Sequence, residues 1–261
     1  MKIIVCVKQV PDTTEVRLDP KTGRLIREGV PSIINPDDKN ALEEALKIKQ
    51  EHEGTKVIAV SMGPPQADVA LREALAMGAD DAILISGREF GGSDTWATSY
   101  IIATAIKKIP DFDIIFCGRQ AIDGDTAQVG PQIAEQLDIP QITYVQDLKI
   151  EGNKVIANRQ LEDGYCVVEA EMPVLLTAIK DLNTPRYMTP KGIFDSYNKQ
   201  VTVWGFKDVP VDPEKIGLAG SPTNVKRTFS PEQKGRGIML EGADKTTVKT
   251  LIDNLEKKHL L

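Results

Sequence analysis

The chain has 261 residues and a formal net charge of -6, from 32 Lys and Arg against 38 Asp and Glu. This length supports one sizeable core or a core with an appendage, and a net negative surface argues against general nucleic-acid binding. No apolar run approaches the ~20 residues that a membrane span needs. The first seven residues are too short for a signal-peptide core and meet Lys8 at once, so they predict a strand.

Cysteine and histidine are scarce and scattered. Cys6, Cys117 and Cys166 lie far apart in the sequence, and His52 and His259 sit in charged surroundings. A metal site, a disulfide framework and catalysis by a Ser-His-Asp or Cys-His unit are therefore all poorly supported. A reducing, cytoplasmic location fits this composition best.

Short β-branched runs alternate with longer amphipathic stretches in the first half of the chain. The runs are apolar almost throughout, which is typical of strands buried on both faces of a parallel sheet. They cover residues 2–10, 56–61, 82–85, 113–117 and 174–179.

Helices are predicted between these runs. Asn35 to Asp38 supplies an N-cap, a proline for the first turn and two carboxylates for the positive end of the helix dipole. Further helices are expected over residues 65–77, from residue 93 or 94 to before Pro110, and after Asp125. The alternation predicts a doubly wound α/β fold with a mainly parallel sheet.

The sequence departs from this plan at two predicted hairpins, over residues 16–26 and 143–160, which would add antiparallel strands. After about residue 190 the pattern degrades, and only residues 245–258 again indicate a helix. We therefore divide the chain into an α/β domain over residues 1–190 and a C-terminal arm with a helix over residues 191–261. The arm either packs on a partner or is a disordered tail.

Ligands of open α/β sheets bind beyond the carboxyl ends of the strands, and residues 118–130 form the richest loop there. Its small residues let backbone N–H groups approach an anion at the start of the next helix. Asp123 and Asp125 would repel phosphate unless they cap the helix or face a ribose or counter-ion. An ordinary polar connection is the alternative.

Two other loops are weaker candidates. Residues 91–99 place a glycine pair before a hydroxyl-rich helix start, although plain capping by Ser93 or Asp94 is the preferred explanation of that pattern. Residues 61–65 form a rigid turn that either contacts an adenine or only redirects the chain. Neither the Rossmann glycine fingerprint nor the P-loop motif occurs.

Six segments together resemble the β subunit of electron transfer flavoprotein. They are residues 5–10, 35–36, 61–64, 76–80, 118–125 and 183–187. The resemblance implies an adenine-nucleotide-binding α/β domain, with a sheet plan like that of universal stress proteins, which associates with an α subunit holding the electron-transferring FAD. In this family the β subunit binds structural AMP in the conventional branch and a second FAD in the electron-bifurcating branch.

The resemblance also assigns residues by position. The implied nucleotide site comprises Cys6, Asn35, Asp38, Met62, Ala121, Ile122, Asp123, Gly124, Asp125, Thr126, Ala127 and Gln128. Asn35 and Met62 would contact the adenosine part, and residues 123–128 the pyrophosphate and ribitol. The family's dehydrogenase-docking loop aligns with residues 181–187, and its assigned docking residues are Leu182, Pro185, Arg186 and Tyr187. A buried loop residue is the alternative for Leu182.

Thr95 and Thr98 match positions that contact the second flavin in the bifurcating branch, and residues 123–131 and 220–223 also resemble that branch. The implied function is a β-site FAD that accepts hydride from NADH and divides the electrons. One goes to the α-subunit flavin and an acyl-CoA dehydrogenase, the other to ferredoxin or flavodoxin. No catalytic side chain is expected. The alternatives are a conventional subunit with AMP and a nucleotide-sensing stress-type module.

Overall fold

The computed structural model describes the chain over residues 1–12, 31–226, 235 and 237–261. The chain forms two compact units, Met1–Val225 and Lys226–Leu261. The hairpin expected over residues 16–26 lies outside the described residues.

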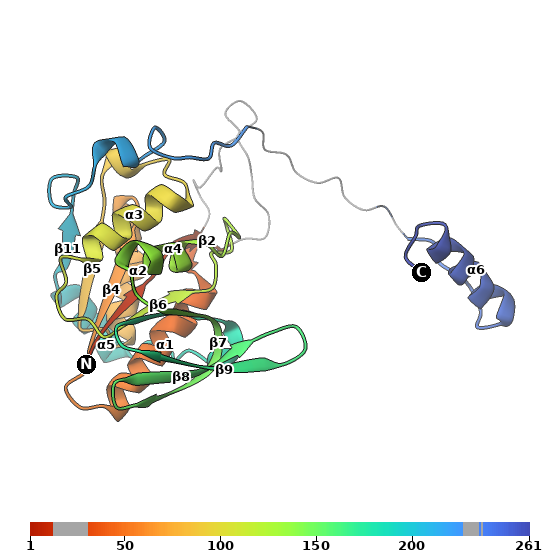
Figure 1. Cartoon of the computed structure of the whole chain (residues 1–261), viewed down its shortest axis with the longest axis horizontal. Coiled ribbons are helices and arrows are strands. Elements are labelled where there is room, and N and C mark those ends of the chain that lie inside the picture. The colour runs from red at the N-terminus through yellow and green to blue at the C-terminus, as the bar shows by residue number, and fades with distance from the viewer. Residues whose placement is uncertain (13–30, 227–234, 236) are drawn as a thin grey trace. The chain divides into compact units, whose positions relative to one another are not determined.

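A nine-stranded sheet forms the centre of the first unit, in the order β11-β5-β4-β1-β6-β10-β7-β8-β9 (Figure 1). Its strands are β1 Lys2–Cys6, β4 Lys56–Met62, β5 Asp81–Ile85, β6 Ile114–Gly118, β7 Gln141–Glu151, β8 Lys154–Gln160, β9 Tyr165–Glu171, β10 Val174–Ala178 and β11 Val201–Trp204. Pairing is parallel from β11 to β7, and antiparallel between β7 and β8 and between β8 and β9. The mainly parallel sheet with added antiparallel strands is confirmed.

The helices cover both faces of this sheet. Helices α1 (Pro36–Glu51) and α2 (Asp68–Met77) pack on one face with alternate strand residues such as Ile3. Helices α3 (Thr95–Ile106) and α4 (Val129–Leu137) pack on the other face. Fully buried apolar side chains thus lie above and below the parallel strands, which confirms the doubly wound plan.

The first strand is shorter than predicted. The main-sheet strand β1 stops at Cys6, and the chain then joins β2 (Gln9–Pro11) to β3 (Ser32–Ile34) in a separate antiparallel pair. The break occurs at Lys8, whose backbone N–H donates to the side chain of Asp38 and not to a neighbouring strand. An apolar run alone does not reveal this change of partner.

The first unit also extends beyond residue 190, the boundary expected from sequence. Helix α5 (Pro190–Asn198) precedes β11, which pairs with β5 and so lengthens the main sheet. Val209 and Ile216 are buried in the core beside α3. Single 3-10 turns complete the unit at Pro65–Ala67, Arg88–Phe90, Lys180–Leu182 and Pro213–Lys215.

In the second unit, α6 (Lys245–Glu256) confirms the predicted C-terminal helix. The Asp244 carboxylate caps it by accepting a hydrogen bond of 2.8 Å from the backbone N–H of Thr247. Its apolar residues Val248, Leu251 and Ile252 are 52%, 48% and 42% exposed. Among the described residues of both units, no helix has the length and apolar character needed to cross a membrane.

Candidate functional site

A cavity of about 470 Å³ opens at the carboxyl ends of β1, β4 and β6. After β1 the chain adds β4 on one side, whereas β6 lies on the other side of β1. The loops that follow these strands therefore diverge and leave a crevice, which is where open α/β sheets bind their ligands. The volume lies in the range of small-molecule sites.

Most of the residues assigned by resemblance line this cavity. They are Cys6, Asp38, Met62, Thr95, Thr98, Ala121, Gly124, Thr126, Ala127 and Gln128. Asn35, Ile122, Asp123 and Asp125 are not among the lining residues. The side chains of three of these four, Asn35, Asp123 and Asp125, make hydrogen bonds or ion pairs that hold the loop after β6.

Asn35 fastens that loop to the start of α1. Its fully buried amide donates to the backbone carbonyl of Gln120 over 2.8 Å and accepts from the backbone N–H of Ile122 over 3.0 Å. The side chain of Ile122 points outward and is 51% exposed. Asn35 was expected to contact adenosine, whereas in the structure its amide hydrogen-bonds the protein's own backbone.

Both aspartates that would repel a phosphate are engaged within the protein. Asp123 lies 2.6 Å from the ammonium group of Lys8, and the amide of Gln120 donates to Asp125. Asp125 and Ala127 have φ of 52°, an uncommon conformation for residues other than glycine. Left-handed residues are a feature of some loops whose N–H groups form anion sites, although the N–H of Asp125 itself donates to the carbonyl of Ala121.

Asp38 joins the ends of the two strands that frame the cavity. Its buried carboxylate accepts hydrogen bonds from the backbone N–H groups of Lys8, over 2.8 Å, and Gly118, over 3.0 Å. Burial raises the pKa of Asp38 to about 7, although these N–H groups lower it. The carboxylate thus fixes the ends of β1 and β6 against the first turn of α1.

The two helices that begin at the cavity differ at their N-termini. In α3 the Asp94 carboxylate accepts from the backbone N–H of Ala97 over 3.0 Å, so the capping explanation for this loop is confirmed. No side chain among the described residues caps α4, whose first turn lines the cavity. The Thr95 hydroxyl donates to the Gln128 side chain over 3.0 Å and connects the two loops. The first turn of α4 is the better anion site.

The residues that sequence reasoning missed are mainly on the cavity floor. Cys117 and Phe90 line it together with Val60. A hydrogen bond with Cys6 and burial raise the pKa of the Cys117 thiol, so it stays protonated at neutral pH. The position of Cys117 near the end of a buried strand is the one signal that could have found it. Phe90 has no comparable signal.

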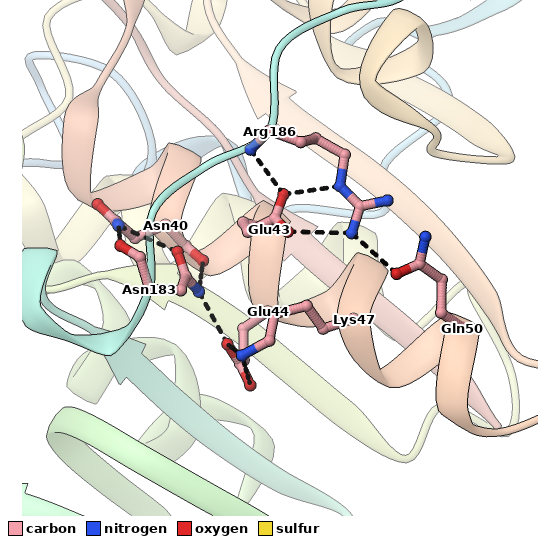
Figure 2. Close-up of polar contacts among 7 residues, drawn as sticks. All are labelled: Asn40, Glu43, Glu44, Lys47, Gln50, Asn183 and Arg186. Carbon is pink, nitrogen blue, oxygen red and sulfur yellow. Dashed lines mark hydrogen bonds and ion pairs between the residues drawn. The ribbon is translucent and has the colours of Figure 1, made fainter.

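The segment assigned to docking lies apart from this cavity lining. Leu182 is half-buried and packs against the core on the α1 side of the sheet. Pro185 and Arg186 are also half-buried, whereas Tyr187 is 85% exposed. The carboxylate of Glu43 on α1 binds the guanidinium group of Arg186 (Figure 2).

The cavity lining has both apolar and polar groups, as small-molecule sites usually have. It combines apolar side chains such as Met62 and Phe90 with hydroxyl groups, main-chain N–H groups and an uncapped helix start. Within the described ranges, no group of three or more His, Cys, Asp or Glu is placed to hold a metal ion.

These features define a doubly wound α/β domain with a ligand crevice at the point where strand order reverses. Residues 22–209 match the model of the electron transfer flavoprotein domain. The chain is 59% identical to an electron transfer flavoprotein subunit beta of Thermoanaerobacterium thermosaccharolyticum, with both chains covered in full. The chain belongs to the electron transfer flavoprotein family, as a β subunit.

Other relatives have names that mention particular reductases. The chain is 57% identical, over all of both chains, to the caffeyl-CoA reductase-Etf complex subunit CarD of Acetobacterium woodii. It is 55% identical, again over both full chains, to the acryloyl-CoA reductase electron transfer subunit gamma of Anaerotignum propionicum. The resemblance read from the sequence is thus confirmed at the level of the family and subunit.

Proposed function

We propose that this chain holds FAD in the cavity and serves as the β subunit of an electron-bifurcating flavoprotein. A flavin bound there would accept hydride from NADH and pass one electron to the α-subunit FAD and an acyl-CoA dehydrogenase, and the other to ferredoxin or flavodoxin. The protein's own task is to bind and orient the cofactor. No side-chain acid or base is needed for it.

The hydroxyl groups on the α3 side of the cavity carry this proposal. Thr95 and Thr98 line the cavity beside Gln128, which accepts a hydrogen bond from Thr95. The α3 side of the cavity thus supplies polar groups in addition to the uncapped start of α4. The start of α4 by itself suits only the phosphate part of a nucleotide. A dinucleotide with a polar ring system uses both features, whereas AMP uses only one.

Each part of the site has a separate role in the proposal. Backbone N–H groups of residues 126–130, which line the cavity, bind the pyrophosphate, and Met62 contacts the adenosine. Thr95 and Thr98 donate hydrogen bonds to the flavin or to the adjoining phosphate. Asn35 acts indirectly, by holding the loop at Gln120 and Ile122.

Two surfaces are assigned to partners. Residues 181–187, which include the exposed aromatic side chain of Tyr187, dock an acyl-CoA dehydrogenase. Helix α6, whose apolar residues are exposed, packs on the α subunit. It belongs to residues 226–261, the part of the expected arm that lies outside the first unit. The names of the caffeyl-CoA and acryloyl-CoA reductase subunits support both an α partner and an acyl-CoA reductase.

Coupled electron transfer tests this function. The purified αβ complex is mixed with NADH, oxidised ferredoxin, an acyl-CoA dehydrogenase and its enoyl-CoA substrate. Ferredoxin reduction should appear only when the enoyl-CoA is present, because the two electrons leave by coupled routes. Dehydrogenase reduction without any ferredoxin reduction would favour the conventional subunit with AMP. A chain that binds nucleotide but supports neither reaction would favour the sensing module.

A further inference from the structure

We propose that Glu43 on α1 is a positioning residue for partner docking, which it performs by holding residues 183–187 in one conformation through Arg186. This inference rests on the proposed docking role of residues 181–187. It assigns a function to a buried carboxylate that neither contacts the cavity nor lies on the docking surface itself.

The ion pair between Glu43 and Arg186 is made by several aligned bonds. One carboxylate oxygen of Glu43 accepts from Nε of Arg186 over 2.8 Å and from its backbone N–H over 2.9 Å. The other oxygen accepts from Nη2 over 3.0 Å. The Glu43 side chain is 7% exposed and that of Arg186 is 28% exposed. Two parallel bonds from a guanidinium group fix orientation as well as distance.

Asn183 makes a second attachment to the same helix (Figure 2). Its side-chain amide donates to the backbone carbonyl of Asn40, over 3.0 Å, and to the carboxylate of Glu44, over 2.8 Å. The amide of Asn40 donates in return to the backbone carbonyl of Asn183, over 2.7 Å. The segment is thus held at both ends by buried polar side chains of α1.

These side-chain hydrogen bonds hold the segment in place, whereas other parts of the chain are held by backbone hydrogen bonds. Residues 183–188 belong to no helix or strand, and within the described part of the chain they make no backbone–backbone hydrogen bond. A loop without such bonds has many conformations, and ordering it on binding weakens the complex. The contacts from α1 order the segment before the partner arrives.

This arrangement also explains which side chains of the segment remain exposed for a partner to contact. Arg186 and Asn183 are turned to α1, whereas Tyr187 is 85% exposed and Thr184 is exposed. A fixed backbone on either side of Pro185 therefore presents the same two side chains each time. Complexes that need no rearrangement form faster and bind more tightly.

Glu43→Gln tests the inference in the full αβ complex. The substitution keeps the side-chain shape but places an amide N–H group against the donors of Arg186. Hydrogen exchange of the peptide covering residues 183–188 should become about tenfold faster, because glutamine has one acceptor oxygen where the carboxylate has two and so cannot keep all three bonds to Arg186. The KM for a purified acyl-CoA dehydrogenase should rise about tenfold, which corresponds to ~1.4 kcal/mol. The kcat and the rate of flavin reduction by NADH should stay unchanged.

Glu73→Gln is the matched control. Glu73 on α2 binds Lys39 on α1 over 2.5 Å, so this variant breaks another ion pair of the same helix away from the docking segment. It should change neither the exchange of residues 183–188 nor the KM. Should Glu43→Gln not fold, Asn183→Ala loosens the same segment from its other end and has the same expected effects.

The outcomes separate this inference from the proposed function. Tyr187→Ala should raise the KM whether or not Glu43 positions the segment. A raised KM in Tyr187→Ala with an unchanged KM in Glu43→Gln would overturn the positioning role alone. An unchanged KM in both variants, with faster exchange in Glu43→Gln, would overturn the docking role of the segment and this inference with it.

Discussion

The backbone N–H of Gly118 donates to the buried carboxylate of Asp38 over 3.0 Å, and the two residues lie so close that Gly118 has no room for a side chain. A Cβ at Gly118 would lie 2.6 Å from the backbone nitrogen of Asp38. The end of β6 therefore contacts the first turn of α1 directly. Because Asp38 and Gly118 both line the cavity, this contact shapes its wall.

Gly118→Ala should lower the free energy of unfolding by about 1–3 kcal/mol, as is typical of added volume in a packed site. It should also weaken AMP binding, because α1 and the loop after β6 must move apart. Gly124→Ala is the control, since a Cβ there meets no atom within 4 Å. Urea unfolding of both variants measures the effect. Equal stability of the two would show that the close contact is not maintained in solution.

The raised pKa of Asp38 predicts a dependence of stability on pH. Because the pKa rises from its ordinary value of 3.8 to about 7 on folding, the folded chain holds a proton that the unfolded chain releases between these values. The contribution of Asp38 to the free energy of unfolding therefore falls as pH rises from about 4 to 7, by about 4 kcal/mol at most. It is constant above that range.

Asp38→Asn removes this titration. The stability of the wild-type chain relative to this variant should decrease steadily from pH 4 to pH 7, as followed by urea unfolding at each pH. A constant difference across the range would mean that the carboxyl group keeps its ordinary pKa despite its burial.

Asn35→Ala should release the loop after β6. The carbonyl of Gln120 and the N–H of Ile122 both lose a buried partner, so we expect about 1–3 kcal/mol of destabilisation. AMP affinity, measured by calorimetry, should fall about tenfold or more. Asn158→Ala removes a side-chain bond to Asp147 on the antiparallel strands and should leave the affinity unaltered. Wild-type affinity in Asn35→Ala would argue against a role for the loop in binding.

The cysteines offer a chemical test of the cavity. Cys6 lines it, Cys166 is exposed on β9, and Cys117 is buried with a raised pKa. Bound AMP or FAD should slow alkylation of Cys6 by N-ethylmaleimide several-fold and leave Cys166 equally reactive. Cys117 should react most slowly, because only the thiolate is nucleophilic. Peptide mass spectrometry gives all three rates, and a nucleotide-independent rate at Cys6 would place the ligand elsewhere.

Much of the fold was predictable because it depends on local patterns. Apolar runs gave the parallel strands, and the Asn35 to Asp38 cap gave the start of α1. The predictions that failed concern elements that depend on contacts with residues distant in the sequence. The strand predicted over residues 2–10 leaves the main sheet early because the N–H of Lys8 bonds to the side chain of Asp38, distant in the sequence, and not to β4. Helix α5 and β11 were missed because they are short and depend on packing against α2 and β5.

The site was predictable to a similar degree. Position in the chain placed the loop after β6 at the strand ends, and resemblance supplied most of the lining residues. Neither source separates a residue that lines the cavity from one that holds the lining in place. Asn35 and Asp123 are of the second kind, because the partners of Asn35 lie more than eighty residues away and Asp123 pairs with Lys8 on the opposite loop. Such pairs become visible only in the folded chain.

The cofactor content of the αβ complex tests the account most directly. The complex is purified in full, denatured, and its released flavin and AMP are counted by absorbance and mass spectrometry. A cavity that binds a dinucleotide through the loop after β6 and Thr98 predicts about two FAD per complex, and loss of only one of them in Thr98→Val. One FAD together with one AMP in the wild-type complex would contradict it.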